Sequence, residues 1–259
     1  MDNTDFTTSN IVLSTRIIML KFEEFTQSKK CEEFTYRLTE AARGYADFMQ
    51  IGVVDAHQIF KVVINPEGKR TVAFVAGLHG DEPGGPMGVL KFIENKPYIP
   101  KTKRVVIIPL ANPTGFLLNT RKTKNGVDLN REFLKDELTG ECEIIWNALK
   151  DEDLNMLHTI HEDTSLSTFY LYYTHDKKLA NDIKDLAKKY FKLFNGDEVN
   201  GDKVQDGLVP LPHIKKGTLE DRVLSFGIPY ITTETPGKSP MIKRTRFTEE
   251  AMKTVIHYI

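Results

Sequence analysis

A histidine and a glutamate, His79 and Glu82, lie in the glycine-rich segment TVAFVAGLHGDEPGG, which follows an apolar stretch. The His-x-x-Glu spacing lets a tight turn direct an imidazole and a carboxylate toward one point, and zinc accepts both kinds of ligand. Gly77 and Gly80 permit the positive φ angles that such a turn can require. Because this spacing also occurs on ordinary surfaces and helices, a metal site needs a further ligand from elsewhere in the chain.

Two histidines, His158 and His161, end a second apolar stretch in the segment LHTIHEDTS. In a regular strand, side chains three positions apart point to opposite faces, so we expect only one of these imidazoles to bind a metal. The other would pack in the interior or bond a neighbour. The acids Glu162 and Asp163 are candidates to hold an imidazole by a hydrogen bond.

Arginine and glutamate candidates follow two further apolar stretches. Arg121, Asn130 and Arg131 come after the apolar run RVVIIPL, and Glu234 ends the stretch YITTE. Arginine suits bidentate binding of a carboxylate and stabilisation of an oxyanion, although a solvated basic loop is the simpler interpretation. A carboxyl group such as Glu234 is either a cap of the following segment or a general base.

The elements that must position these residues alternate between strands and helices. Apolar or alternating segments predict strands at residues 58–64, 71–76, 104–110, 156–160, 168–173 and 229–233. Amphipathic segments predict helices at residues 32–50, 84–94, 142–150, 176–194, 219–226 and 248–258. This order indicates an α/β fold of three layers, α/β/α, with a mixed, largely parallel central sheet. Ligands of such sheets bind beyond the carboxyl ends of the strands, where the candidate residues lie.

Composition sets the broad class. The chain has 259 residues, 40% hydrophobic and 27% charged, with 35 basic and 36 acidic side chains, which is ordinary for a globular protein and predicts no nucleic-acid partner. No apolar stretch is long enough to span a bilayer, the N-terminus lacks a signal-peptide pattern, and the two cysteines are isolated. We therefore expect one catalytic domain over residues 1–259. The protein would lie in the cytoplasm without a membrane partner, and a homo-oligomer is compatible with the sequence. Residues 1–50 would be an N-terminal extension that could extend the sheet, cover an edge or mediate a dimer.

Taken together, the motifs resemble those of the zinc carboxypeptidases, the metallocarboxypeptidase superfamily. The resemblance covers residues 71–237 and is closest to compact prokaryotic members; it rests on HGDE (79–82), NPTG (112–115), Arg121, GVDLNREF (126–133), His161 and TETPG (233–237), in the family's order. It implies a zinc-dependent hydrolase, a metalloprotease of the carboxypeptidase type, that removes a C-terminal amino acid from a peptide. One Zn²⁺ per chain would be held by His79, Glu82 and His161.

The resemblance also implies a role for each remaining candidate. Arg121 would polarise the scissile carbonyl and stabilise the oxyanion. Asn130 and Arg131 would hold the free carboxylate of the substrate. Glu234 would act as general base on the attacking water and then protonate the leaving amine.

One departure from the family, one question of specificity and two alternative functions stay open at this point. The segment LVPLPHIKKGTLEDR lacks the tyrosine that digestive members carry before the catalytic glutamate, and His213 is the candidate to replace it. In the same segment, Glu220 and Asp221 could read a basic substrate side chain, although an exposed helix start is the preferred interpretation.

The first alternative is an N-acyl amino-acid deacylase of the succinylglutamate desuccinylase/aspartoacylase type. Against it, the first motif has Asp81 where those enzymes have asparagine, and only residues 235–259 follow Glu234. The second alternative is a binding module that kept the fold without catalysis.

Overall fold

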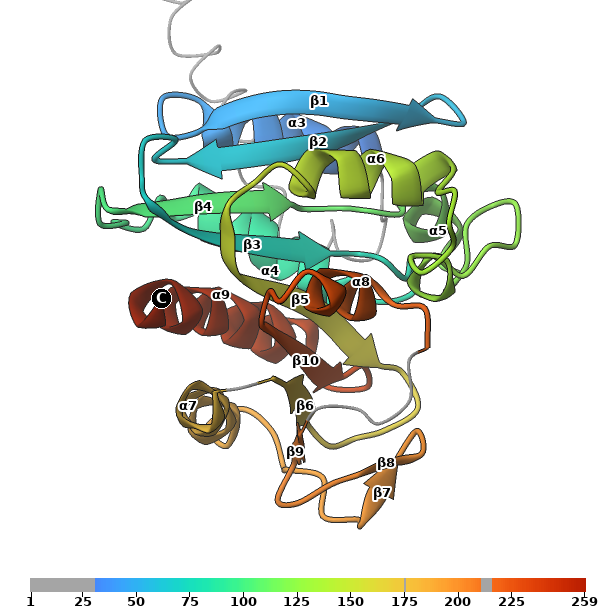
Figure 1. Ribbon diagram of the computed structural model, residues 1–259, viewed down its shortest axis with the longest axis vertical. Helices are drawn as coiled ribbons and strands as arrows, with labels where there is room; N and C mark the ends of the chain where they lie inside the picture. The colour runs from blue at the N-terminus through green and yellow to red at the C-terminus, as the bar shows by residue number, and fades with distance from the viewer. Residues whose placement is uncertain (1–30, 175, 211–215) are drawn as a thin grey trace, which may run out of the picture.

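An eight-stranded sheet forms the centre of the computed structural model, which describes residues 31–174, 176–210 and 216–259. The strand order is β1-β2-β4-β3-β5-β10-β6-β9 (Figure 1). The bounds are β1 (Asp47–Val54), β2 (His57–Ile64), β3 (Arg70–Ala76), β4 (Lys103–Ile108), β5 (Leu154–Asp163), β6 (Tyr170–Tyr173), β9 (Leu208–Pro210) and β10 (Tyr230–Pro236). A separate two-stranded sheet joins β7 (Glu198–Val199) to β8 (Asp202–Lys203).

The four middle strands, β4, β3, β5 and β10, run parallel to one another, whereas β1, β2 and β6 pair antiparallel with their inner neighbours. Six of the seven residues of β3 are buried, as expected for a strand covered on both faces. Within β3, Val72 and Phe74 belong to one hydrophobic core, and Ala73 and Val75 belong to the other. The mixed sheet and its parallel centre confirm the predicted fold class.

Helices cover both faces of this sheet, which completes the three layers (Figure 1). The helices α3 (Cys31–Ala42), α4 (Gly84–Glu94), α7 (Lys177–Ala187) and α9 (Met241–Tyr258) supply the first core. The helices α6 (Gly140–Leu149) and α8 (Leu219–Ser225) supply the second, in front of the sheet in Figure 1. Two short helices, α5 (Pro113–Leu118) and η1 (Leu129–Arg131), lie in the segment that follows β4.

The predicted helix over residues 32–50 was wrong in its second half. Helix α3 ends at Ala42, Gly44 adopts a φ of 67°, and the chain then forms strand β1. Phe48 stacks on Phe60 across the β1–β2 hairpin, with 4.6 Å between ring centroids. A helical stripe and a strand face share some spacings over a short window, and the hairpin contact decided between them. Residues 47–50 therefore extend the sheet, one of the three roles considered for the N-terminal extension.

Other differences concern the ends of elements. The helix predicted over residues 176–194 ends at Ala187, and the helix predicted over residues 248–258 begins at Met241. The short strands β7, β8 and β9 were not predicted, because two or three residues carry no readable period. Within the described residues, no helix is long and apolar enough to cross a membrane.

Candidate metal centre and catalytic site

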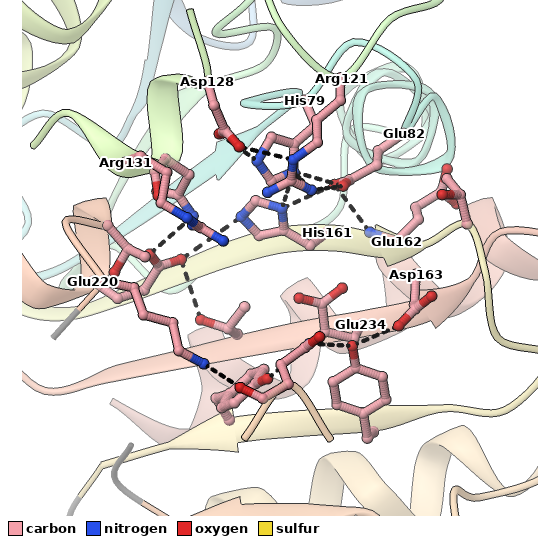
Figure 2. A pocket seen from close by; sticks show the side chains of 18 of the residues that line it. His79, Glu82, Arg121, Asp128, Arg131, His161, Glu162, Asp163, Glu220 and Glu234 are labelled. Atoms are coloured by element: carbon pink, nitrogen blue, oxygen red, sulfur yellow. Dashed lines mark hydrogen bonds and ion pairs between the residues drawn. The ribbon is translucent and has the colours of Figure 1, made fainter. Parts of the chain in front are cut away.

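A cavity of about 530 Å³ opens at the carboxyl ends of the parallel strands β3, β5 and β10 (Figure 2). All seven candidate residues from the sequence line it: His79, Glu82, Arg121, Asn130, Arg131, His161 and Glu234. They come from five separate segments of the chain. The structure therefore brings the predicted residues together at the predicted edge of the sheet.

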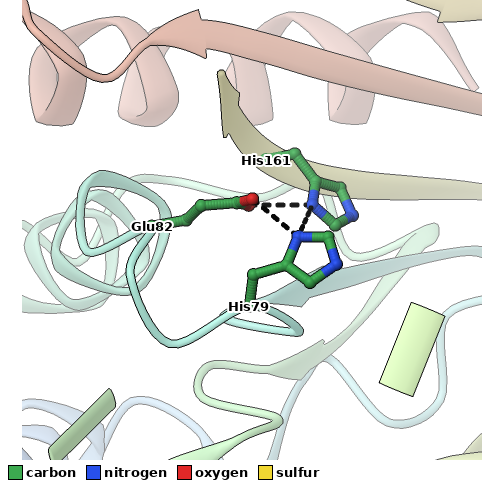
Figure 3. A group of neighbouring side chains, drawn as sticks. All are labelled: His79, Glu82 and His161. Carbon is green, nitrogen blue, oxygen red and sulfur yellow. Dashed lines mark hydrogen bonds and ion pairs between the residues drawn. The ribbon is translucent and has the colours of Figure 1, made fainter. Parts of the chain in front are cut away.

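The side chains of His79, Glu82 and His161 converge on one point of this cavity (Figure 3). The Nδ1 atoms of the two imidazoles are 3.2 Å apart. Glu82 Oε1 lies 2.6 Å from His79 Nδ1, and Glu82 Oε2 lies 2.9 Å from His161 Nδ1. All three side chains are at most 4% exposed. Two imidazole nitrogens and one carboxylate make a donor set that suits zinc, so the residues present fit a metal ion.

A close backbone contact shapes the turn that carries His79. A Cβ added to Gly80 would lie 1.9 Å from the carbonyl carbon of Gly115, so only glycine fits there. Gly115 belongs to the NPTG motif, in which the Asn112 side chain accepts a hydrogen bond from Gly115 N (2.8 Å) and caps helix α5. Gly80 of the first motif and Gly115 of the second therefore let the His79 turn pack directly against the backbone of helix α5.

His158 lies outside the group formed by His79, Glu82 and His161, called here the metal-binding group because it is the candidate site for a metal ion, although His158 is only three residues from His161. Its Nε2 lies 3.0 Å from Thr233 Oγ1, and its ring packs edge-on against Phe74. Burial lowers the pKa of His158 to about 3, so the imidazole is neutral. The two histidines thus occupy different environments, as the three-residue spacing in a strand predicts.

Each imidazole of the metal-binding group has a carboxylate behind its Nε2 atom. Asp128 Oδ1 lies 3.3 Å from His79 Nε2, and Asp128 Oδ2 accepts a hydrogen bond from Arg121 Nε at 2.9 Å. Glu220 Oε1 lies 3.7 Å from His161 Nε2. Such partners fix the orientation of metal-binding histidines. Asp128 stands inside the GVDLNREF motif, but sequence reasoning gave it no role.

The preferred interpretation of Glu220, an exposed helix start, was wrong. Glu220 is 5% exposed and lines the cavity. Its neighbour Asp221 belongs instead to the capping box of helix α8, in which Thr218 is the N-cap and the Asp221 side chain bonds back to the backbone of Thr218. The Thr-x-x-Asp spacing of this box was readable in the sequence, but the burial of Glu220 was not.

The suggestion that Glu162 or Asp163 holds an imidazole was also wrong. Glu162 forms a buried ion pair with Arg244 of helix α9 (2.8 Å) and accepts a hydrogen bond from Gly84 N at the start of α4. Asp163 accepts a hydrogen bond from the Tyr170 hydroxyl (2.8 Å). Glu162 acts on the metal-binding group only through its backbone, since its N–H donates to Glu82 Oε2 (3.1 Å).

The two arginines line the more open part of the cavity. The Arg121 side chain is 42% exposed, and its Nη1 lies 3.3 Å from His79 Nδ1. Arg131 is exposed and donates from Nη1 to the backbone oxygen of Asn130 (2.5 Å). The Asn130 amide is already bonded at both ends, to Glu220 Oε2 (3.3 Å) and to Leu219 N (2.9 Å). In this structure Asn130 therefore fixes the wall of the cavity.

Glu234 lies in strand β10 beside His161, its register partner on β5. It makes no hydrogen bond or ion pair with any residue that the structure describes. Burial raises the pKa of Glu234 to about 8. A partly buried carboxyl group without a partner, facing a metal-binding group, is free to exchange a proton with a substrate. His213 lies outside the described residues.

Known proteins resemble this chain in sequence and fold. Residues 68–171 match the profile of the succinylglutamate desuccinylase/aspartoacylase catalytic domain. Carboxypeptidase SOL1 of Arabidopsis thaliana is 27% identical over 175 residues, which cover 58% of this chain and 35% of that protein. The chain thus spans about a third of the length of this curated relative.

Two solved structures share the fold at low sequence identity. A metallopeptidase candidate from Shewanella amazonensis superposes with a TM-score of 0.81 at 21% identity, covering 89% of this chain and 94% of that one. A metallo-carboxypeptidase from Burkholderia cenocepacia has a TM-score of 0.69 at 14% identity, covering 88% and 68%. These findings confirm the predicted resemblance to the metallocarboxypeptidase superfamily and its desuccinylase/aspartoacylase relatives, and the superpositions show that the chain shares their fold.

Proposed function

We propose that the chain is a zinc-dependent metallocarboxypeptidase that removes the C-terminal amino acid from a peptide. The observation that carries this proposal is the convergence of His79, Glu82 and His161 in a cavity that also holds two unsatisfied groups, Glu234 and the outer part of Arg131. The motif order shared with metallocarboxypeptidases supports the same function.

The metal-binding group fits one zinc ion per chain. Three protein ligands leave a coordination position open, which is typical of catalytic zinc rather than structural zinc. Zinc, when bound, would supply a Lewis acid and lower the pKa of a bound water to about 7. The carboxylates of Asp128 and Glu220 would keep the Nε2 edges of His79 and His161 protonated, so that both Nδ1 atoms stay available as ligands.

Glu234 and Arg121 carry the proton and the charge of the reaction. Glu234 takes a proton from the attacking water at a carboxylate oxygen and then delivers it to the nitrogen of the leaving amine. The carboxyl group has no hydrogen-bond partner among the described residues, so it can take the proton and hold it until the leaving nitrogen accepts it. Arg121, held by Asp128, donates hydrogen bonds to the scissile carbonyl oxygen as negative charge develops there.

Arg131 is proposed to bind the free carboxylate of the substrate. Apart from its bond to the Asn130 carbonyl, its guanidinium has no partner among the described residues and can bind a carboxylate with two hydrogen bonds. Asn130 belongs to the same substrate site, and it acts there by fixing the η1 turn that carries Arg131.

An N-acyl amino-acid deacylase is the second candidate function, and the match to the desuccinylase/aspartoacylase profile favours it. It would use the same metal-binding group, base and arginines. The order of the motifs HGDE, NPTG, GVDLNREF and TETPG is that of the metallocarboxypeptidases, and Asp81 stands where the deacylases have asparagine. A peptide is therefore the preferred substrate.

One substrate panel separates these functions. Blocked dipeptides with a free C-terminus, their C-terminal amides, and N-acetyl or N-succinyl amino acids are incubated with the enzyme, with and without a chelator. We expect chelator-sensitive release of the C-terminal amino acid from the free-acid dipeptides only, with activity restored by added zinc. Glu234→Gln serves as the control for contaminating peptidases. Hydrolysis of the acyl amino acids alone would establish the deacylase, and no hydrolysis with zinc bound would favour a binding module.

A further inference from the structure

Glu220 is a buried carboxylate that contacts both His161 of the metal-binding group and Asn130 of the proposed substrate site. It takes no part in bond making or proton transfer in the proposed mechanism. It is the second residue of helix α8 and is 5% exposed. Figure 2 shows His161 between Glu82 and Glu220. A charged group is costly to bury unless its oxygens are bonded, so the partners of Glu220 indicate what it does.

Three of the four partners of Glu220, namely Asn130, His161 and Thr232, line the cavity, and the fourth, Thr159, lies in β5 two residues before His161. Its Oε1 accepts hydrogen bonds from the hydroxyls of Thr159 and Thr232 and lies 3.7 Å from His161 Nε2. Its Oε2 accepts a hydrogen bond from Asn130 Nδ2 at 3.3 Å. His161 Nε2 is itself buried without a hydrogen-bond partner among the described residues, so Glu220 is the acceptor it faces.

The same arrangement occurs on the other side of the metal-binding group. Asp128 contacts His79 through Oδ1 and Arg121 through Oδ2. Each carboxylate therefore joins one imidazole of the metal-binding group to one polar residue of the substrate site. The two carboxylates differ in burial, because the Asp128 side chain is 17% exposed and the Glu220 side chain is 6% exposed.

We propose that Glu220 is a positioning residue that orients His161 for the metal and, through Asn130, fixes the turn that presents Arg131. The first part of this inference, that Glu220 orients His161 (the metal half), stands on the contact between these two residues alone. The second part, that Glu220 fixes the turn of Arg131 (the substrate half), rests on the proposed function. The competing role, an acid that reads a cationic substrate side chain, is disfavoured because both oxygens of Glu220 already have donors inside the fold.

Glu220→Gln tests both halves, because it keeps the shape and removes the charge. We expect zinc affinity, measured by competition with a chromophoric chelator, to fall about 10–100-fold, as for other partners of metal-binding histidines. We also expect KM to rise for free-acid substrates and not for their amides, because Arg131 reads the carboxylate. The matched control is Glu249→Gln, which alters another buried carboxylate that accepts from Asn95 and pairs with Lys253, far from the cavity. It should leave zinc affinity and the KM difference unchanged.

Several outcomes would overturn the inference. Wild-type zinc affinity in Glu220→Gln excludes the metal half, and an unchanged KM difference between free acid and amide excludes the substrate half. A change only in the ranking of substrate side chains makes Glu220 a specificity residue instead. If Glu220→Gln does not fold, Thr159→Val removes one donor to Glu220 and should weaken zinc binding in the same direction; unchanged affinity contradicts the inference. Zinc titration needs no turnover, so failure of the proposed function would leave its result readable.

Discussion

The two sides of the cavity differ in how completely their polar groups are bonded. On the metal side, His79, Glu82 and His161 are at most 4% exposed and contact one another at 2.6–3.2 Å. On the substrate side, Glu234 has no partner among the described residues, and Arg131 is exposed. In the proposed function, the metal side is a preformed set of zinc ligands. The substrate side consists of polar groups that would find their bonding partners in the substrate.

The metal side is therefore the more rigidly bonded part of the site, and the difference matches the two proposed tasks. A metal ion is bound more tightly when its ligands are held in place before it arrives, whereas a base and a carboxylate-binding arginine must be free to contact a changing substrate. Changes on the metal side should therefore alter metal binding. Changes on the substrate side should alter turnover or KM and leave the metal in place.

The largest effect is expected from His79→Ala or His161→Ala. Removing one of three ligands should weaken zinc binding by more than the roughly 10–100-fold that loss of an outer partner costs, and should abolish activity. Zinc content after dialysis, measured by atomic emission, checks this. His158→Ala should keep its zinc, because His158 bonds Thr233 outside the group. Loss of zinc from this variant alone would reverse the assignment of the two histidines.

Glu234→Gln should keep zinc and the fold but lower kcat by about 10²–10⁴-fold, the range of a lost general acid–base group. Single-turnover rates together with zinc content test it. Turnover close to that of the wild type would exclude Glu234 as the base. The lack of a partner for Glu234 would then not reflect a catalytic role of the substrate side.

Arg131→Ala should lower kcat/KM for a free-acid substrate by about 10²–10³-fold, equivalent to roughly 2–4 kcal/mol for one partner of a charged pair. Amidation of the substrate should cost a similar factor in the wild type. The two changes together should cost little more than either alone, because they remove the same contact. Equal cleavage of acid and amide by the wild type would show that the enzyme does not read a free carboxylate.

A smaller effect concerns pH and the stability of the metal-free chain. Because burial raises the pKa of Glu234 from about 4.5 to about 8, the folded state holds this proton more tightly than the unfolded state does. The contribution of Glu234 to stability should therefore be lost as pH rises through this window. Glu234→Gln lacks the titrating proton, so its advantage in unfolding free energy over the wild type should grow from pH 5 to pH 8. Urea unfolding in the presence of chelator measures this, and parallel pH profiles would argue against the raised pKa.

The sequence was sufficient for features that are local or that follow from strand direction. His79 and Glu82 are three residues apart and share one turn, so their common direction could be predicted from spacing and glycines. The carboxyl ends of parallel strands meet at one edge, so β3, β5 and β10 had to bring His79, His161 and Glu234 together there. The apolar runs of these strands are long enough to be recognised without a structure.

Only the tertiary structure decided the partners of the buried acids and the identity of the short elements. The spacing Thr218-x-x-Asp221 indicates a capping box, but nothing in the local pattern shows that Glu220 is buried beside His161; the packing of α8 on the sheet decides this. Glu162 likewise pairs with Arg244, 82 residues away, rather than with a nearby imidazole. Residues 47–54 form a strand that pairs with β2, and the stacking of Phe48 on Phe60 across this hairpin stabilises it. Contacts between distant segments depend on how whole elements pack, and the energy of one such contact exceeds the small differences in local propensity that a sequence displays.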